Sequence, residues 1–278
     1  MASTNRLTKA PRSNSQQKES SLKDDHVIDE TKEYYRQRAS QYSDWSRPTG
    51  KYEGGSEPDE SFFGEAKMLL DALDSEKLTG DVLEIASGTG IWTEALTRHA
   101  TSITALDSSQ EMIDRCKTRL KGNPKVQYVH ADFYAWTPDR HYDAVTFSFW
   151  ISHVPSWKLD EFTAKISHCL RRRGRVFFVD QQRSAMKYEV MDQPGGEIAS
   201  RTLEDGKTFN VVKHFYVPEE ITRSLRKNGI ETRISNTPQP LLLCTRRESP
   251  IVRHGRLGKK ELELVLPKSH NQVARNQP

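Results

Sequence analysis

The chain has little cysteine and no long hydrophobic run. Its 278 residues include three cysteines, Cys116, Cys169 and Cys244, which lie far apart in apolar stretches. This odd, scattered set excludes a disulfide framework and a zinc site, and it suits buried thiols in a reducing compartment. A transmembrane helix needs about 20 consecutive apolar residues, and no stretch of this sequence comes near that length. The N-terminus also lacks the apolar core of a secretory signal. We therefore expect a cytoplasmic protein with no membrane span and no metal.

Large hydrophobic side chains are scarce at both ends of the chain. Hydrophobic content is 35% overall, residues 1–28 are rich in Ser, Gln, Lys and Asn, and residues 248–278 are polar and basic. Such segments bury too little apolar surface to offset the entropy of ordering. We expect disordered tails there, around one domain at 29–247. The N-terminal tail has no acid before Glu19, so an organelle transit peptide is the alternative to a solvated tail.

From Asp81 onward, apolar strand-like segments alternate with helix-like segments. Strands are predicted at 81–86, 102–107, 126–130, 142–149 and 174–180, with helices at 91–100, 108–122 and 158–170. Ser108 and Glu111 are expected to form the capping box of the second helix. This alternation, with strands that are apolar throughout, is typical of an α/β, doubly wound, mainly parallel sheet.

A strand pair near the end of the domain brings the predicted sheet to seven strands. An extra strand is predicted at 208–216, a helix at 218–229, and a strand pair at 230–235 and 241–246. We expect that pair to close one edge of the sheet in antiparallel fashion. Two helices are predicted upstream, at 30–45 and 60–73, and the polar segment 181–216 is predicted as an insertion that forms a substrate-side wall.

The first strand runs into a glycine-containing turn, "ASGTG", that three kinds of nucleotide site could use. A phosphate loop needs a lysine after the last glycine, and none follows Gly90. A dinucleotide fingerprint needs a third glycine, where Thr93 stands. The acid Glu84 precedes Ala86, Gly88 and Gly90. This arrangement resembles the acid-x-G-x-G-x-G motif of class I S-adenosylmethionine-dependent methyltransferases, with Ala86 replacing the first glycine.

Two carboxylates at later strand ends extend the resemblance. Asp107 ends the second strand, where the family's ribose-binding acid stands, although NAD sites use a carboxylate there too. Asp132 and Phe133 follow the third strand and match the family's adenine site. The resemblance covers about residues 30–247, is nearest to the ubiquinone and menaquinone methyltransferase group, and implies a Rossmann-like fold with S-adenosylmethionine as cofactor. The other cofactor contacts that it implies are Tyr35, Arg38, Ser108, Met112 and Phe149.

Candidate groups for the chemistry follow the fourth and fifth strands. His153, in "FSFWISHVP", is the first candidate general base because a histidine titrates near neutrality. A loop histidine bonded to backbone is the alternative. Asp180, which ends the fifth strand, is the second candidate, with a capping role as its alternative. We expect substrate contacts from Trp150, Tyr188, Arg201, Lys213 and Tyr216. The cations hint at an acidic or carbonyl-bearing acceptor, with solvated surface charge as the alternative.

The sequence thus predicts a methyltransferase that acts on a small molecule, at oxygen first, with nitrogen and carbon open. A nucleic-acid methyltransferase is the alternative, with the basic tails and "RRRGR" at 171–175 as its electrostatic handle. Against it, the fourth strand lacks a [DNS]PP[YFW] tetrad, the net charge is only +4, and the arginines are expected at a helix end away from the cofactor. A non-catalytic partner protein and an oxidoreductase are further alternatives. Oligomeric state stays open.

Overall fold

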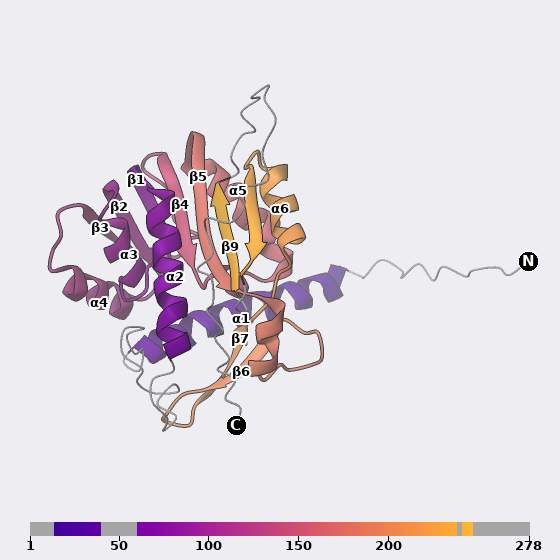
Figure 1. Cartoon of the computed structure of the whole chain (residues 1–278). Helices are drawn as coiled ribbons and strands as arrows, with labels where there is room; N and C mark the ends of the chain where they lie inside the picture. The colour runs from indigo at the N-terminus through magenta and orange to yellow at the C-terminus, as the bar shows by residue number, and fades with distance from the viewer. Residues whose placement is uncertain (1–13, 40–59, 238–240, 247–278) are drawn as a thin grey trace, which may run out of the picture. The chain divides into compact units, whose positions relative to one another are not determined.

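The centre of the molecule is one large sheet (Figure 1). The computed structural model describes residues 14–39, 60–237 and 241–246, which belong to a single compact unit ending at Arg247. The strands of this sheet are β1 (Gly80–Ile85), β2 (Ala100–Asp107), β3 (Val126–His130), β4 (Tyr142–Ser148), β5 (Leu170–Gln181), β8 (Thr232–Asn236) and β9 (Leu241–Arg246). Their order is β3-β2-β1-β4-β5-β9-β8, with β1 to β5 parallel and β9 antiparallel to both of its neighbours. The predicted doubly wound sheet with an antiparallel edge pair is confirmed.

The helices lie between and around these strands. They are α1 (Asn14–Arg38), α2 (Glu60–Glu76), α3 (Ile91–Leu96), α4 (Gln110–Leu120), α5 (Leu159–Cys169) and α6 (Pro218–Lys227), with short 3-10 turns η3 (Ile151–His153), η4 (Ser156–Lys158) and η5 (Arg183–Tyr188). Helix α1 begins at Asn14, so part of the segment expected as a tail is helical. None of the described helices is long and apolar enough to cross a membrane.

Both faces of the sheet are buried, which explains why its strands read as continuous apolar runs. Successive side chains of a strand point to opposite faces. Leu83 and Ile85 therefore join the core under α5 and α6, together with Phe162. Val82, which precedes Leu83 and lies on the other face, packs with Leu69 of α2 and with side chains of α3 and α4.

A second, two-stranded sheet is the main element that sequence patterning missed in part. Strand β7 (Thr208–Val212) was predicted, but its antiparallel partner β6 (Ile198–Thr202) was not. The sequence of β6, "IASRT", has too few apolar residues to stand out. Figure 1 shows this sheet beside α1, on the side of the large sheet where β4 and β5 end. Tyr34 of α1 packs with Leu203 and Val211.

One local prediction needs correction. The N-cap of α4 is Ser109, not Ser108: the Ser109 hydroxyl accepts a hydrogen bond from the Met112 amide and donates one to Glu111. The arginine run at 171–175 lies within β5, directly after α5 ends at Cys169. Arg171 there forms ion pairs with Asp81 and Asp143, which lie at the beginnings of β1 and β4.

Candidate functional site

The candidate site lies at the edge where the five parallel strands end. The turn after β1 has three residues in the left-handed region: Ala86 at φ 54°, Gly88 at φ 55° and Gly90 at φ 83°. Glycine is required most clearly at Gly90, because a Cβ there would lie 2.7 Å from the Cys116 sulfur. Ala86 occupies the same kind of conformation with a methyl group, so the turn carries strain at the position of the missing glycine.

Glu84 of β1 anchors this turn through its buried side chain. It is buried, and its Oε2 accepts a 2.5 Å hydrogen bond from the Thr93 hydroxyl. Burial raises the pKa of Glu84 to about 8. Thr93, which stands where a dinucleotide site has its third glycine, therefore joins β1 to α3 through a side-chain hydrogen bond. In this structure Glu84 positions the turn from within the core.

Asp107 closes the turn from the neighbouring strand. Its two carboxylate oxygens accept hydrogen bonds of 2.9 Å from the backbone amides of Gly88 and Ser109. Each oxygen keeps a second lone pair for a ligand. Burial raises the pKa of Asp107. Met112 is buried, whereas Ser108 is exposed.

Asp132 faces α1 at the third strand end. Its Oδ2 lies 2.8 Å from the Lys32 ammonium, and its Oδ1 accepts a hydrogen bond from the Tyr134 amide. Lys32 thus forms an ion pair with the carboxylate predicted for adenine. The Phe133 ring is in the core, edge-on to Phe162, so it does not point toward a ligand at this edge.

The fourth strand end brings His153 into contact with α1. Phe149, at φ 54°, turns the chain out of β4 and leads into η3. The Nδ1 of His153 lies 2.6 Å from the Val212 carbonyl, and its Nε2 lies 2.7 Å from the Tyr35 hydroxyl. Because a carbonyl only accepts, Nδ1 carries the hydrogen and Nε2 accepts the Tyr35 proton. Burial lowers the pKa of His153 well below its usual value, so the ring is neutral.

Cations surround this pair. Arg201 of β6 donates to the Tyr35 oxygen at 3.1 Å and forms an ion pair with Glu189. Lys213, which follows β7, is 3% exposed, and its ammonium donates to the Ser152 hydroxyl at 2.8 Å. Burial lowers the pKa of Lys213 to about 8. Tyr35, His153, Arg201, Lys213 and Ser152 therefore form one side-chain cluster.

Asp180 holds the base of that cluster. It is fully buried, and its Oδ2 accepts a 2.9 Å hydrogen bond from the Ser152 amide. Its Oδ1 accepts from the Gln181 amide. These contacts match the capping alternative and place Asp180 behind η3.

Several predicted site residues lie elsewhere. Trp150 packs against Phe133 and Phe162, and Tyr216 is 2% exposed with its hydroxyl on the Val154 carbonyl, so neither contacts the cluster. Arg38, by contrast, stays near the cluster: it is half-buried, its guanidinium lies over the ring of Tyr34, and its charge helps to lower the pKa of His153. Tyr188 ends η5, but its side chain lies outside the described part of the structure.

Sequence reasoning missed Lys32, Ser152 and Glu189. Lys32 is one charge among many on a polar helix, and its partner Asp132 lies 100 residues away. Ser152 had a usable signal, since it directly precedes His153 after a predicted strand. Glu189 lies in an irregular segment whose pairing with Arg201 depends on the unpredicted strand β6.

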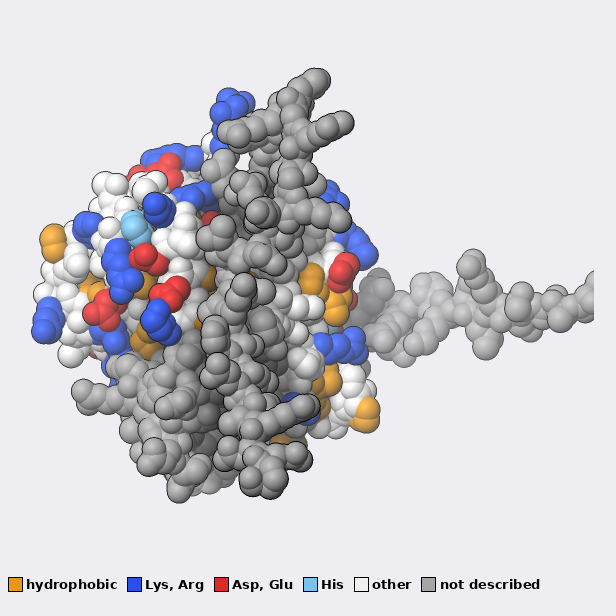
Figure 2. All heavy atoms as spheres, in the orientation of Figure 1, with side chains coloured by type: hydrophobic (Ala, Val, Ile, Leu, Met, Phe, Trp, Pro, Cys, Tyr) orange, Lys and Arg blue, Asp and Glu red, His pale blue; other side chains and the backbone are white. Residues whose placement is uncertain are grey.

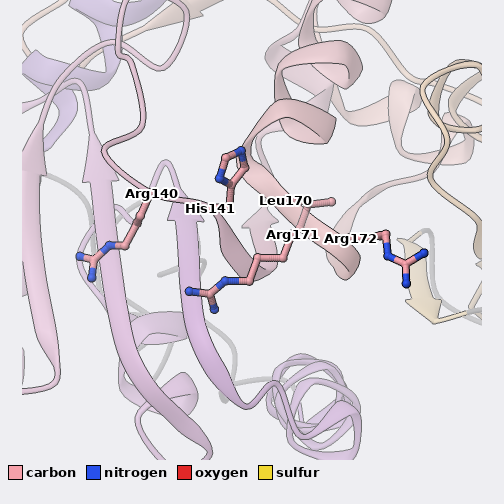
Figure 3. Close-up of a pocket in the computed structure, with 5 residues that line it drawn as sticks. All are labelled: Arg140, His141, Leu170, Arg171 and Arg172. Carbon is pink, nitrogen blue, oxygen red and sulfur yellow. The ribbon is translucent and has the colours of Figure 1, made fainter.

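The arginine-rich alternative site lies at the other end of the sheet. Arg140, His141, Leu170, Arg171 and Arg172 line an open depression there (Figure 3). Arg171 is neutralised by two carboxylates. In Figure 2, positive and negative side chains are interspersed on the visible described surface around α3 and α4. This view has no extended patch of one sign.

Comparison with known proteins yields one consistent family. Residues 82–174 match the model of a methyltransferase domain. A ubiquinone biosynthesis O-methyltransferase from Aromatoleum aromaticum is 30% identical over 154 residues, which cover 54% of this chain and 64% of that protein. A demethylmenaquinone methyltransferase from Clavibacter sepedonicus is 37% identical over 98 residues, which cover 34% of this chain and 38% of that protein. The chain therefore spans less than two thirds of the length of these two relatives.

Solved structures extend the similarity over about four fifths of the chain. The structure of a DhpI–SAH complex is 32% identical, with a TM-score of 0.64, and the match covers 81% of this chain and 98% of that one. A DhpI–SAM–HEP complex gives a TM-score of 0.65 at the same identity, covering 80% and 98% of the two chains. With the strand order, the glycine turn and the carboxylates at successive strand ends, these similarities assign the fold and the family. The chain belongs to the class I S-adenosylmethionine-dependent methyltransferases.

Proposed function

We propose that the protein transfers a methyl group from S-adenosylmethionine to the hydroxyl oxygen of a small molecule. The observation that carries the oxygen assignment is the hydrogen bond between Tyr35 and a neutral His153, because a hydroxyl acceptor must lose its proton as it is methylated. The name of the Aromatoleum aromaticum relative, an O-methyltransferase, supports the same choice.

The turn after β1 fits the cofactor. The Ser87 hydroxyl is buried there without a hydrogen-bond partner in the described part of the chain, and such a group calls for a ligand atom. We assign the amino acid end of the cofactor to the turn at Ser87 and Gly88, the ribose to Asp107, and the adenine to Asp132 and the Phe133 backbone. When bound, S-adenosylmethionine supplies an activated methyl group on a sulfonium.

Proton removal from the acceptor runs through Tyr35. The His153 Nε2 lone pair already accepts the Tyr35 hydrogen, so an acceptor hydroxyl reaches the pair at the Tyr35 oxygen. The acceptor proton passes to this oxygen while the Tyr35 proton passes to Nε2. Arg201, 3.1 Å from the same oxygen, stabilises negative charge that develops there. Bound S-adenosylmethionine would supply the methyl group, whose bond to sulfur would break as the acceptor oxygen bonds to the carbon, and the proton would be left on His153.

The surroundings of this pair suit a small acceptor. Tyr35 and His153 keep partial exposure between α1 and η3, and both elements are held by β7. Free, buried Cys116, Cys169 and Cys244 support our assignment of the enzyme to a reducing, cytoplasmic compartment.

The test is methyl transfer from cofactor labelled with carbon-13 in its methyl group, with a panel of hydroxylated, aminated and carbon-nucleophile small molecules and an RNA pool. Carbon NMR of the products distinguishes a methoxy group from a methyl on nitrogen or carbon. We expect a methoxy product, strongly reduced kcat in Tyr35→Phe and His153→Gln, and unchanged kcat in His141→Gln, whose imidazole is exposed at the far end of the sheet. Methylated nitrogen, carbon or RNA as the sole product would contradict the proposal.

A further inference from the structure

Lys213 is a buried cation that the proton transfer does not use. It is 3% exposed, and the partners of its ammonium are the Ser152 hydroxyl at 2.8 Å and the Phe215 ring, whose centroid lies 5.2 Å away. Among the residues that the structure describes, no carboxylate lies within 4.0 Å of it. Both partners are neutral. A buried ammonium with no carboxylate bonded to it is costly to keep, and an anionic ligand bonded to it would lower that cost.

The carboxylates near Lys213 attract it, but in the described part of the chain none forms a hydrogen bond with its ammonium. The charge of Asp180 raises the pKa of Lys213, while its two oxygens accept hydrogen bonds from the Ser152 and Gln181 amides. Glu189 is bound by the Arg201 guanidinium through two hydrogen bonds. Arg201 itself adds a second cation to the cluster. The pKa of Lys213 falls to about 8 because burial outweighs the attraction of these carboxylates.

The cation is next to the proposed reaction centre. Ser152, its hydrogen-bond partner, directly precedes His153 in η3, and the His214 amide donates to the Ser152 carbonyl at 2.8 Å. Arg201 contacts the Tyr35 oxygen from the opposite strand of the small sheet. Tyr35, His153 and Arg201 are partly exposed, whereas Lys213 and Ser152 lie deeper. Lys213 and Arg201 both lie close enough to His153 for their charges to lower its pKa, so the two cations flank the Tyr35–His153 pair.

We propose that the acceptor carries an oxyanion group, and that Lys213, Ser152 and Arg201 bind it beside the hydroxyl that is methylated. This inference rests on the proposed function and names its substrate class. Carboxylate, phosphate and phosphonate share the required chemistry, because each accepts charge-assisted hydrogen bonds from an ammonium and a guanidinium. Recognition of the anion also orients the hydroxyl toward Tyr35, since the two groups are held by one cluster.

The test uses small anions and does not require the acceptor to be known. Purified protein saturated with SAH is titrated with sodium phosphate and, separately, sodium acetate, against sodium chloride at equal ionic strength, and Tm is followed. A ligand that binds the folded state raises Tm in a saturable way. We expect this rise for phosphate, acetate or both, and the stronger of the two identifies the oxyanion type.

Two variants and a control make the outcome specific. Lys213→Met keeps the length of the side chain without its charge, and Arg201→Gln removes the second cation; each should weaken anion binding about tenfold or more. Arg172→Gln, on the exposed depression at the other sheet end, should leave it unchanged. No saturable rise with either anion, or the same rise in Lys213→Met, would overturn the proposal. Calorimetry with S-adenosylmethionine on the same samples shows separately whether the cofactor assignment holds.

Discussion

At the scale of single residues, the turn after β1 is the most informative feature. Ala86 holds a φ of 54° where the family motif has glycine, and Gly90 holds a φ of 83° against the Cys116 sulfur. The two positions thus differ in what they tolerate. Ala86 keeps a methyl group in a strained conformation. At position 90 a side chain would meet the same backbone strain and would also clash with the Cys116 sulfur.

Glycine is therefore expected to relieve strain at one position, and alanine to create it at the other. Ala86→Gly should raise the free energy of unfolding by up to about 1 kcal/mol, because glycine adopts positive φ without a steric cost. Gly90→Ala should lower it by about 2–4 kcal/mol, since it adds a positive-φ penalty and a clash. Urea unfolding monitored by circular dichroism measures both. Destabilisation by Ala86→Gly comparable to that by Gly90→Ala would contradict this explanation.

Glu84 makes stability depend on pH. Its pKa is raised to about 8 in the folded state from an ordinary value near 4.5, so the unfolded chain releases this proton first. The stability that it contributes is complete below pH 4.5 and is lost as the pH rises through 8. Glu84→Gln should flatten the pH dependence of unfolding between these values, whereas Glu94→Gln, on the exposed face of α3, should not. Equal curves for wild type and Glu84→Gln would mean that Glu84 is ionised in the folded protein.

The titration of Lys213 should lower kcat/KM for the acceptor at alkaline pH. Its pKa of about 8 means that the ammonium loses its charge above that pH, and the free enzyme then binds an anionic acceptor less well. With the acceptor found in the labelling screen, kcat/KM should fall above pH 8 in the wild type. In Lys213→Arg the fall should move to higher pH, because a guanidinium stays protonated. An alkaline limb that is unchanged in Lys213→Arg would assign it to another group.

At the scale of elements, α1 completes the proposed catalytic pair without belonging to the large sheet. The Thr31 hydroxyl accepts a hydrogen bond from the Val212 amide at 2.9 Å, and Glu30 accepts one from the Asn210 amide at 2.7 Å. These contacts fix the helix on β7 and place Tyr35 against His153. The cofactor groups Asp107 and Gly88, by contrast, belong to the sheet and its turn.

Loosening α1 should therefore separate turnover from cofactor binding. Thr31→Val leaves the buried Val212 amide without a partner, which should cost about 1–3 kcal/mol of stability. We expect a lower kcat with an almost unchanged Kd for S-adenosylmethionine. Asp29→Asn, on the exposed side of the same helix, serves as the control in activity assays and calorimetry. Equal losses of kcat and cofactor affinity in Thr31→Val would show that α1 holds the cofactor directly.

At the scale of the whole molecule, the sheet was predictable from sequence and the reaction centre only in part. Strands such as β1 and β4 are mainly apolar on both faces, so each can be recognised from its own residues without knowing which strands pair with it. The contact between Arg201 and Tyr35 joins residues 166 positions apart and depends on β6, a strand with a polar sequence. The sequence also could not show where Trp150 and Tyr216 point, because aromatic rings in the segments that follow strands can turn into the core.

Calorimetric titration with S-adenosylmethionine, and separately with NAD and NADP, is the most direct test of the cofactor site. It compares wild type, Asp107→Asn, and Asp114→Asn on the exposed face of α4 as the control. We expect S-adenosylmethionine alone to bind with micromolar affinity, at least about tenfold more weakly in Asp107→Asn and equally in Asp114→Asn. Binding of NAD instead, or full affinity for S-adenosylmethionine in Asp107→Asn, would contradict the site that we assign to the turn after β1.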